Sequence, residues 1–432
     1  MKQITLILLV WLLLAGVTVA DDTNGLPVLT LMDAENIALK NHPQIAEANY
    51  RALAALEVVK ETRAGYFPHA GLFADAVGAS SEGTRIMAGG LNNPTVYDRA
   101  AGGVELSQYL TDFGHTANLT ASSKYQAKAE DQNAFATKEQ VLLEVNVSYF
   151  DALKAKAVMR VAQQTLQTRQ LLLDQVSLLA SNKLKSELDV SFARVQLQQG
   201  KLLLRQSQND SDAALTSLAT ALGGREPVKY QLLEQKPEFD LSTNDIEQAV
   251  ENALTKRPEL LSLRDQREAS LRYAKSERDA RLPTIEAIGV AGDAPAHDDH
   301  LPDDYAAGGV QLSMPLFAGG YYRAHQHEAE LRAQSEDATV RFVEDNIVRD
   351  VRVAWYNVNT AVEQFHTTEE LVRNASESFD LAQARYKIGS SSIVELSQAQ
   401  LSLTAAQIDE TNARYDVLIQ QSNLSFQMGL LR

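Results

Sequence analysis

The chain has 432 residues, 45% of them hydrophobic, so it is long enough for two or three ordinary domains and apolar enough to bury a core. Its 56 acidic residues outnumber its 40 basic residues and give a net charge of −16, which disfavours binding to nucleic acid phosphates. The absence of cysteine excludes disulfide bonds, thiolate metal sites and a cysteine nucleophile.

The first twenty residues have the pattern of a signal peptide. Lys2 precedes an apolar run from Leu6 to Leu14, and small residues then lead to Ala20 and an acidic pair. We expect cleavage after Ala20 and therefore an exported mature protein. An uncleaved N-terminal anchor is the alternative. Beyond this segment no apolar run approaches the roughly 18 residues of a membrane helix, so a membrane span would have to be made of strands.

Residues from about 30 to 63 are predicted to be helical, and the segment 66–113 changes to a period of two. Val104 and Leu106 alternate there with polar or small residues, which indicates a strand with one apolar face. Residues 80–98 carry Gly, Asn, Pro and Asp, as expected of a loop between antiparallel strands. We therefore predict a β-hairpin at about 66–113.

A long helical hairpin follows. Residues 115–222 contain no proline and a single glycine, and they are rich in strong helix formers. A break near residues 181–186 separates a helix at about 115–180 from a second helix, for which Ser186 is the predicted N-cap.

The second half of the chain repeats this order after a linker at 224–241. A helical stretch at about 244–278 precedes a second predicted hairpin at 281–319. Residues 321–428 again lack proline and contain one glycine, Gly389, and Ser392 is the predicted N-cap after that break.

Local matches support an internal duplication. His42-Pro43 recurs as Arg257-Pro258 at an offset of 215, and Gly102-Gly103 recurs as Gly308-Gly309 at an offset of 206. The change of offset falls in the first hairpin, where insertions are best tolerated. We assign residues 21–223 to the first structural repeat and 242–432 to the second.

Helix lengths predict the architecture. A helix rises about 1.5 Å per residue, so each long helix would span roughly 100 Å and needs two shorter helices placed end to end to cover it. The two hairpins supply four strands, whereas membrane barrels have at least eight. Three copies would supply twelve strands around a lumen, which predicts a trimeric duct.

Aromatic residues gather where the strands meet the helices. They form an aromatic belt at a lipid interface or pack within the joint, and the sequence leaves both interpretations open. These residues are Tyr66, Phe67, Tyr109, Phe113, Phe317, Tyr321 and Tyr322.

The chain resembles the TolC-like outer-membrane factor family. The resemblance covers nearly all of the mature chain and is carried by the duplicated Pro43 and Pro258 turns, the segment Tyr386–Leu396 and the segment Ala413–Gly429. It implies a homotrimer with a twelve-stranded transmembrane β-barrel in the outer membrane lipid, continued by an α-helical barrel across the periplasm. It also implies an exit duct that performs no chemistry and works with a periplasmic adaptor protein and an inner-membrane pump.

The resemblance implies a gate at the periplasmic turns. Tyr386 and Asp189 match the family's bonded Tyr and Asp, but Ser391 stands where the family has an Arg. The internal repeat places Lys185 opposite Ser391, so Lys185 either replaces the missing cation or is a solvated turn residue.

Two further sites are implied nearby. Three copies of Glu395 would form a cation-selective ring where the tunnel narrows, with Gln398 at the position of a second acidic ring. An ordinary helix-start glutamate is the alternative. The turn residues Ser186, Gly389 and Ser390 are the expected adaptor-docking tips.

Other classes of protein are less well supported by the sequence. It contains no phosphate-binding loop, no His-Glu-x-x-His pair and no nucleophile elbow, so no enzyme activity and no cofactor are expected. The cluster His297–His300 reads as a solvated acidic loop tip rather than a metal site. The remaining alternatives are the exit duct of a type I protein secretion system and a periplasmic coiled-coil adaptor. The resemblance to the family favours export of small molecules as the function.

Overall fold

The computed structural model describes residues 27–78, 84–85, 95–96, 99–226, 230–234, 245–296 and 303–431. The predicted signal peptide and the His297–His300 cluster lie outside the described residues, as do parts of the predicted loop at 80–98 and of the linker at 224–241.

Helices make up most of the described chain. They are α1 (Leu31–Asn41), α2 (Pro43–Ala64), α3 (His115–Ser181), α4 (Glu187–Ala221), α5 (Ile246–Lys256), α6 (Pro258–Asp279), α7 (Tyr321–Lys387) and α8 (Ile393–Gln427). The strands are β1 (Val28–Leu29), β2 (His69–Val77), β3 (Thr84–Arg85), β4 (Thr95–Val96), β5 (Arg99–Thr111), β6 (Gln231–Leu232), β7 (Thr284–Ala296) and β8 (Asp304–Ser313).

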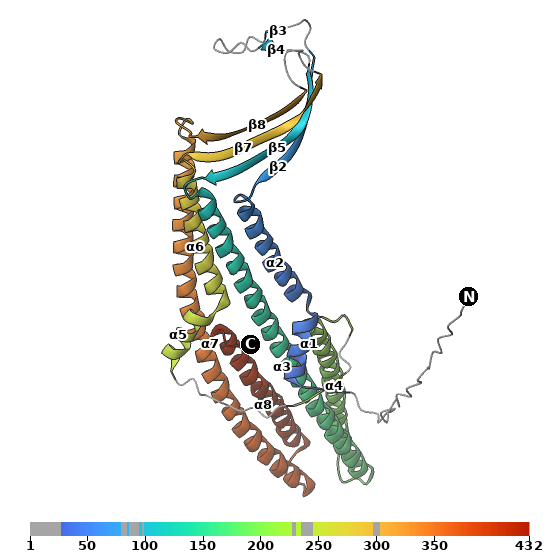
Figure 1. Cartoon of the computed structure of the whole chain (residues 1–432). Coiled ribbons are helices and arrows are strands. Elements are labelled where there is room, and N and C mark those ends of the chain that lie inside the picture. The colour runs from blue at the N-terminus through green and yellow to red at the C-terminus, as the bar shows by residue number, and fades with distance from the viewer. Residues whose placement is uncertain are drawn as a thin grey trace, which may run out of the picture.

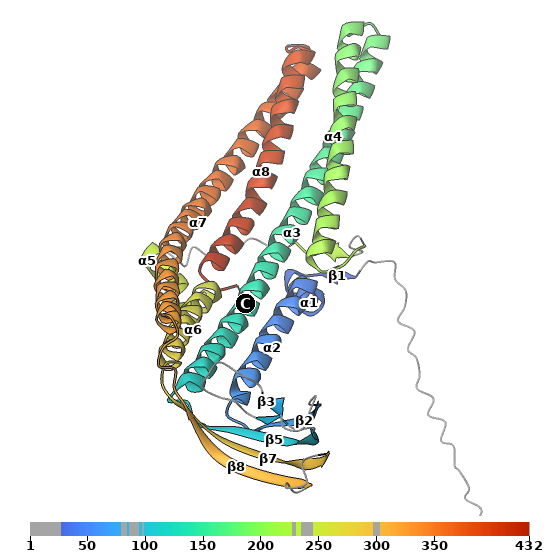
Figure 2. The ribbon, with the colours of Figure 1, turned by 90° about the horizontal axis from the view of Figure 1, so that it is seen from above.

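The molecule is elongated, with the sheet at one end and two helical hairpin tips at the other (Figures 1 and 2). The long helix α3 packs against α2 along one half and against α4 along the other, and α7 packs in the same way against α6 and α8. The predicted pairing of each long helix with shorter helices is therefore confirmed.

Each helical stretch that the sequence predicted as continuous is split at its proline. His42 ends α1 in an extended conformation, and its Nδ1 accepts a hydrogen bond from the amide of Gln44 at 3.3 Å. Arg257 separates α5 from α6 with the same extended backbone but without a side-chain cap. The residue before a proline disfavours the helical conformation, whereas proline itself suits the first helical position.

The four long strands form one antiparallel sheet in the order β2-β5-β7-β8. The two predicted hairpins are confirmed as β2 with β5 and β7 with β8. The pairing of β5 with β7, in which Val104 lies opposite Ala291, joins the two repeats. Among the described strands, β2 and β8 each have one unpaired edge.

A small parallel ladder lies at the middle of the molecule, and sequence patterns did not indicate it. β1 pairs with β6, with Leu29 opposite Leu232. The fully buried Tyr149 on α3 has its hydroxyl 2.8 Å from the Leu29 carbonyl oxygen and 2.9 Å from that of Leu233. This hydroxyl ties the start of the first repeat and the inter-repeat segment to the long helix.

Candidate functional site

The two hairpin tips at the end remote from the sheet share one apolar cluster. It contains residues from α3, α4, α7 and α8, so the tips are packed together rather than independent. Its buried members are Leu172, Val176, Val190, Ala193, Ala382, Tyr386, Ile393 and Leu396.

The α3–α4 turn is closed by local hydrogen bonds. Lys183 adopts a left-handed conformation with φ of 61°, and the amide of Leu184 donates to the Leu179 carbonyl at 2.9 Å. Ser186 then caps α4, because its Oγ accepts from the Asp189 amide at 3.2 Å. The predicted N-cap is confirmed.

The α7–α8 turn has the same backbone design. Gly389 takes the left-handed position with φ of 79°, and the amide of Ser390 donates to the Arg385 carbonyl at 2.9 Å. Ser392 caps α8 through the Glu395 amide at 3.2 Å, as the sequence predicted. Gly389 and Lys183 are equivalent at the repeat offset of 206.

Asp189 and Glu395 are also equivalent in the two repeats, yet their carboxylates have different partners. Asp189 completes a capping box, and its Oδ2 accepts from the Ser186 amide at 2.9 Å and from the Ser186 hydroxyl at 2.8 Å. Glu395 instead accepts from Arg385 Nη1 at 2.9 Å, in an ion pair whose side chains are 56% (Arg385) and 44% (Glu395) exposed. Of these two carboxylates, Glu395 alone has an ion-pair partner among the described residues.

Tyr386 is buried at the centre of the tip cluster. Its hydroxyl has no hydrogen-bond partner among the described residues, so the Tyr–Asp bond implied by the resemblance is not formed within the protomer. Burial, followed by the charge of Asp189, raises the pKa of Tyr386. The structure brings Tyr386 together with Lys185, whose Nζ lies 4.0 Å from the ring centroid.

The remaining predicted site residues are accessible at the surface of the protomer. Ser186, Gly389, Ser390 and Gln398 are exposed, and Ser391 is half-buried. Ser391 Oγ bonds to the neighbouring Ser392 carbonyl, so Ser391 does not link the two turns.

Sequence reasoning missed two features of the tips. Arg385 was not identified as the partner of Glu395, because ten positions separate them across a turn. Large apolar side chains are also exposed there, including the repeat-equivalent pair Leu188 at 65% and Val394 at 55%, and Ile388 at 81%. The recurrence of an apolar residue two positions after each N-cap was the available signal.

No group of three or more potential metal-ligating side chains was found among the described residues. None of the described helices combines the length and apolarity required to cross a membrane.

Comparison with known proteins gives consistent matches over most of the chain. The model of the family described as "Outer membrane efflux protein" matches residues 35–224 and 249–430. The outer membrane protein TolC of Salmonella enteritidis is 26% identical over 424 residues, covering 93% of this chain and 83% of TolC. The alkaline protease secretion protein AprF of Pseudomonas aeruginosa is 22% identical, covering 93% and 85% of the two chains. The solved CmeC outer membrane channel of Campylobacter jejuni superposes with a TM-score of 0.77 at 16% identity, covering 92% and 85%.

Proposed function

The chain belongs to the outer membrane efflux protein family, and from that membership we propose that it is the outer-membrane exit duct of a tripartite efflux pump. In this proposal three copies close a twelve-stranded barrel in the lipid and an α-helical barrel in the periplasm. Small molecules delivered by an inner-membrane pump pass through the lumen without chemical change.

The observation that carries the proposal is the open-edged sheet at one end of a long helical body. Unpaired strand edges can pair with a strand of another chain. Among the described strands, both edges of this sheet are unpaired. Pairing β8 of one copy with β2 of the next satisfies both edges in every copy, and closing with three copies gives a lumen.

Exposure of the joint aromatics supports placement of the sheet in lipid. Tyr66 is 47% exposed, Phe113 is 52% exposed and Phe317 is 89% exposed in the protomer. Packing inside the helix–strand joint would have buried these rings, whereas an interfacial belt leaves them accessible to lipid.

The tip contacts support a closed periplasmic end. The shared apolar cluster holds the two hairpins together, and Lys185 adds a contact between the turns through the ring of Tyr386. We assign the gate to Asp189, Lys185, Tyr386 and Ser391, with Lys185 supplying the cation that Ser391 lacks. Glu395 forms the proposed selectivity ring, followed by Gln398 one turn further on.

The exposed tips are the proposed docking surface for a periplasmic adaptor. Ser186, Gly389 and Ser390 lie there beside Leu188 and Val394, and this mixture of apolar anchors and small polar residues suits contact with helical tips of a partner.

Fractionation tests the proposed function. The full-length protein should be extracted from the outer membrane only by detergent and should migrate as a trimer. In cells where it is the only exit duct, Leu188→Asp with Val394→Asp should abolish export while the trimer remains in the outer membrane. Leu202→Asp, at an exposed position on α4 away from the tips, is the matched control. Release of the protein by osmotic shock would instead identify a periplasmic adaptor.

Whether the duct exports small molecules or proteins requires a separate measurement, because the relative AprF is named for protease secretion. Restored resistance to small toxic compounds in cells lacking their own duct supports efflux. Restored secretion of a protease without such resistance would show a type I secretion duct instead.

A further inference from the structure

A second site lies where the sheet meets the helical body, at the start of α7. A cavity of about 370 Å³ is bordered by Arg281, between α6 and β7, by the β8–α7 connection, and by Arg323 in the first turn of α7. An adjoining cavity shares both arginines and continues along α7 past Gln326 to Glu330. The two arginines thus flank one continuous depression.

Neither guanidinium group has a carboxylate partner among the residues that the structure describes. Arg281 donates only to Gln326 Oε1, at 3.4 Å, and Arg323 has no ion pair or hydrogen bond among the described residues. Glu330, at the far end of the adjoining cavity, already accepts from Gln326 at 2.8 Å and lies 3.7 Å from His327. Two exposed positive charges are therefore uncompensated at this position.

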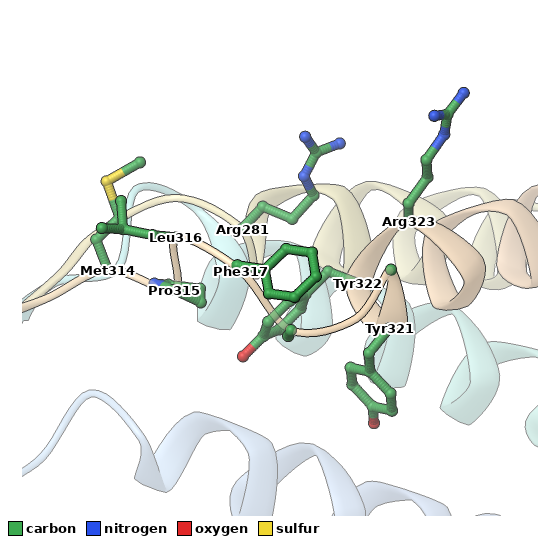
Figure 3. Close-up of a pocket in the computed structure, with 10 residues that line it drawn as sticks. Arg281, Met314, Pro315, Leu316, Phe317, Tyr321, Tyr322 and Arg323 are labelled. Atoms are coloured by element: carbon green, nitrogen blue, oxygen red, sulfur yellow. The ribbon is translucent and has the colours of Figure 1, made fainter.

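The same site is continuous with the apolar face of β8. Val310 and Leu312 alternate with polar residues and are 69% and 65% exposed, and Met314 continues their face just beyond the strand. Figure 3 shows Arg281 and Arg323 extending to the same side as Met314, while Tyr321 points to the opposite side. The ring of Phe317, which is 89% exposed, lies below Arg281 in this view.

The first repeat has no equivalent charge pair. At the repeat offsets, Arg281 corresponds to Tyr66 and Arg323 corresponds to Ala117. The backbone design of the joint, which is common to both repeats, does not require these arginines, so they are a specific feature of the second repeat.

We propose that Arg281 and Arg323 bind the phosphate headgroup of an anionic phospholipid whose acyl chains lie along Phe317, Met314 and the apolar face of β8. Arginine pairs phosphate oxygens through directed N–H donors, and the position at the foot of an apolar strand face is where headgroups end and hydrocarbon begins. The site would hold one such lipid per protomer on the periplasmic side of the barrel.

This inference rests on the proposed placement of the sheet in the outer membrane, so the two must be tested separately. Fractionation of the cell membranes tests whether the sheet lies in the outer membrane. Native mass spectrometry of the detergent-solubilised trimer, titrated with phosphatidylglycerol, reports the site. Diacylglycerol with the same acyl chains serves as the probe that lacks the phosphate.

The test protein carries both Arg281→Gln and Arg323→Gln. The control protein carries both Arg332→Gln and Arg349→Gln, which remove the same charge from exposed positions on α7 outside the cavity. We expect the first variant to lose roughly tenfold in phosphatidylglycerol affinity, with the control and the diacylglycerol binding unchanged. Phe317→Ser should weaken the binding of both lipids, since it removes an acyl-chain contact.

Three outcomes would overturn the inference while leaving the outer-membrane placement intact. One is equal phosphatidylglycerol binding by the wild type and the Arg281 and Arg323 variant. Another is displacement of the lipid by millimolar inorganic phosphate, which would show a free-anion site. The third is dissociation of the trimer in this variant but not in the control, which would show that a neighbouring copy occupies the depression.

Discussion

The ammonium group of Lys185 on the α3–α4 turn lies 4.0 Å from the ring centroid of Tyr386 near the end of α7. This contact joins the two hairpin tips, although 201 positions separate the residues. A cation–π contact contributes about 0.5 to 2 kcal/mol, depending on how well water is excluded. Tyr386 is buried and Lys185 is half-buried, so the contact is partly shielded from solvent.

We predict that Lys185→Ala raises the resting conductance of the protein in planar bilayers, since the proposed trimer would lose three such contacts together. Lys183→Asn is the matched control, because it removes a lysine from the same turn while Asn tolerates the left-handed backbone of that position. A double-mutant cycle with Tyr386→Leu should be non-additive. Additive effects, or unchanged conductance in Lys185→Ala and Asp189→Ala, would contradict the proposed gate.

The Arg385–Glu395 pair predicts opposite effects of two charge removals on ion selectivity. Arg385→Gln leaves the Glu395 carboxylate uncompensated and should increase cation preference, whereas Glu395→Gln should decrease it. Reversal potentials in a salt gradient measure both changes. Glu187→Gln, in the first turn of α4, is the control for simple loss of an acidic tip residue. Identical responses to the Arg385 and Glu395 substitutions would rule out the selectivity ring.

The repeat-equivalent residues Lys183 and Gly389 predict a difference in turn stability. A side chain in the left-handed conformation costs roughly 1 kcal/mol, so Lys183→Gly should stabilise the α3–α4 tip by about that amount. Gly389→Ala should destabilise the α7–α8 tip to a similar extent. Amide hydrogen exchange of the residues flanking each turn checks both directions. Slower exchange in Gly389→Ala would refute the backbone argument.

Tyr149 predicts a dependence of stability on alkaline pH. Burial raises the pKa of Tyr149 to about 12 from its ordinary value of 10.0. The folded state holds the phenolic proton of Tyr149 more tightly than the unfolded state does. The contribution of this proton to the free energy of unfolding is therefore complete below pH 10 and is lost as the pH rises to about 12. The contribution is on the order of 2 kcal/mol.

Thermal unfolding in detergent between pH 9 and pH 12 measures this effect. Tyr149→Phe should lower the melting temperature at pH 9, since the Leu29 and Leu233 carbonyls lose their shared donor, and it should flatten the decline at higher pH. Tyr356→Phe, at a position 58% exposed, is the control. If the melting temperature falls equally with rising pH in the wild type and in Tyr149→Phe, the titrating groups are residues other than Tyr149.

The sequence alone determined the features that depend on neighbouring residues. Helix propensity and the absence of proline predicted α3 and α7, and the caps at Ser186 and Ser392 were identifiable because an N-cap bonds to an amide three positions away. The internal repeat further predicted that both halves would share one order of elements. Alternating hydrophobicity located β5 and β8, since side chains alternate between the two faces of a strand.

Only the tertiary structure decided which distant groups meet. The pairing of β5 with β7, the β1–β6 ladder and the placement of Lys185 against Tyr386 each join residues far apart in the chain. The different partners of the repeat-equivalent Asp189 and Glu395 were also decided by the tertiary structure. Glu395 pairs with Arg385, whereas the first repeat has Leu179 at the position equivalent to Arg385, so Asp189 bonds to Ser186 instead. Local preferences specify the helices and strands, whereas the packing of whole faces specifies their contacts, and that packing is what assembles the proposed gate.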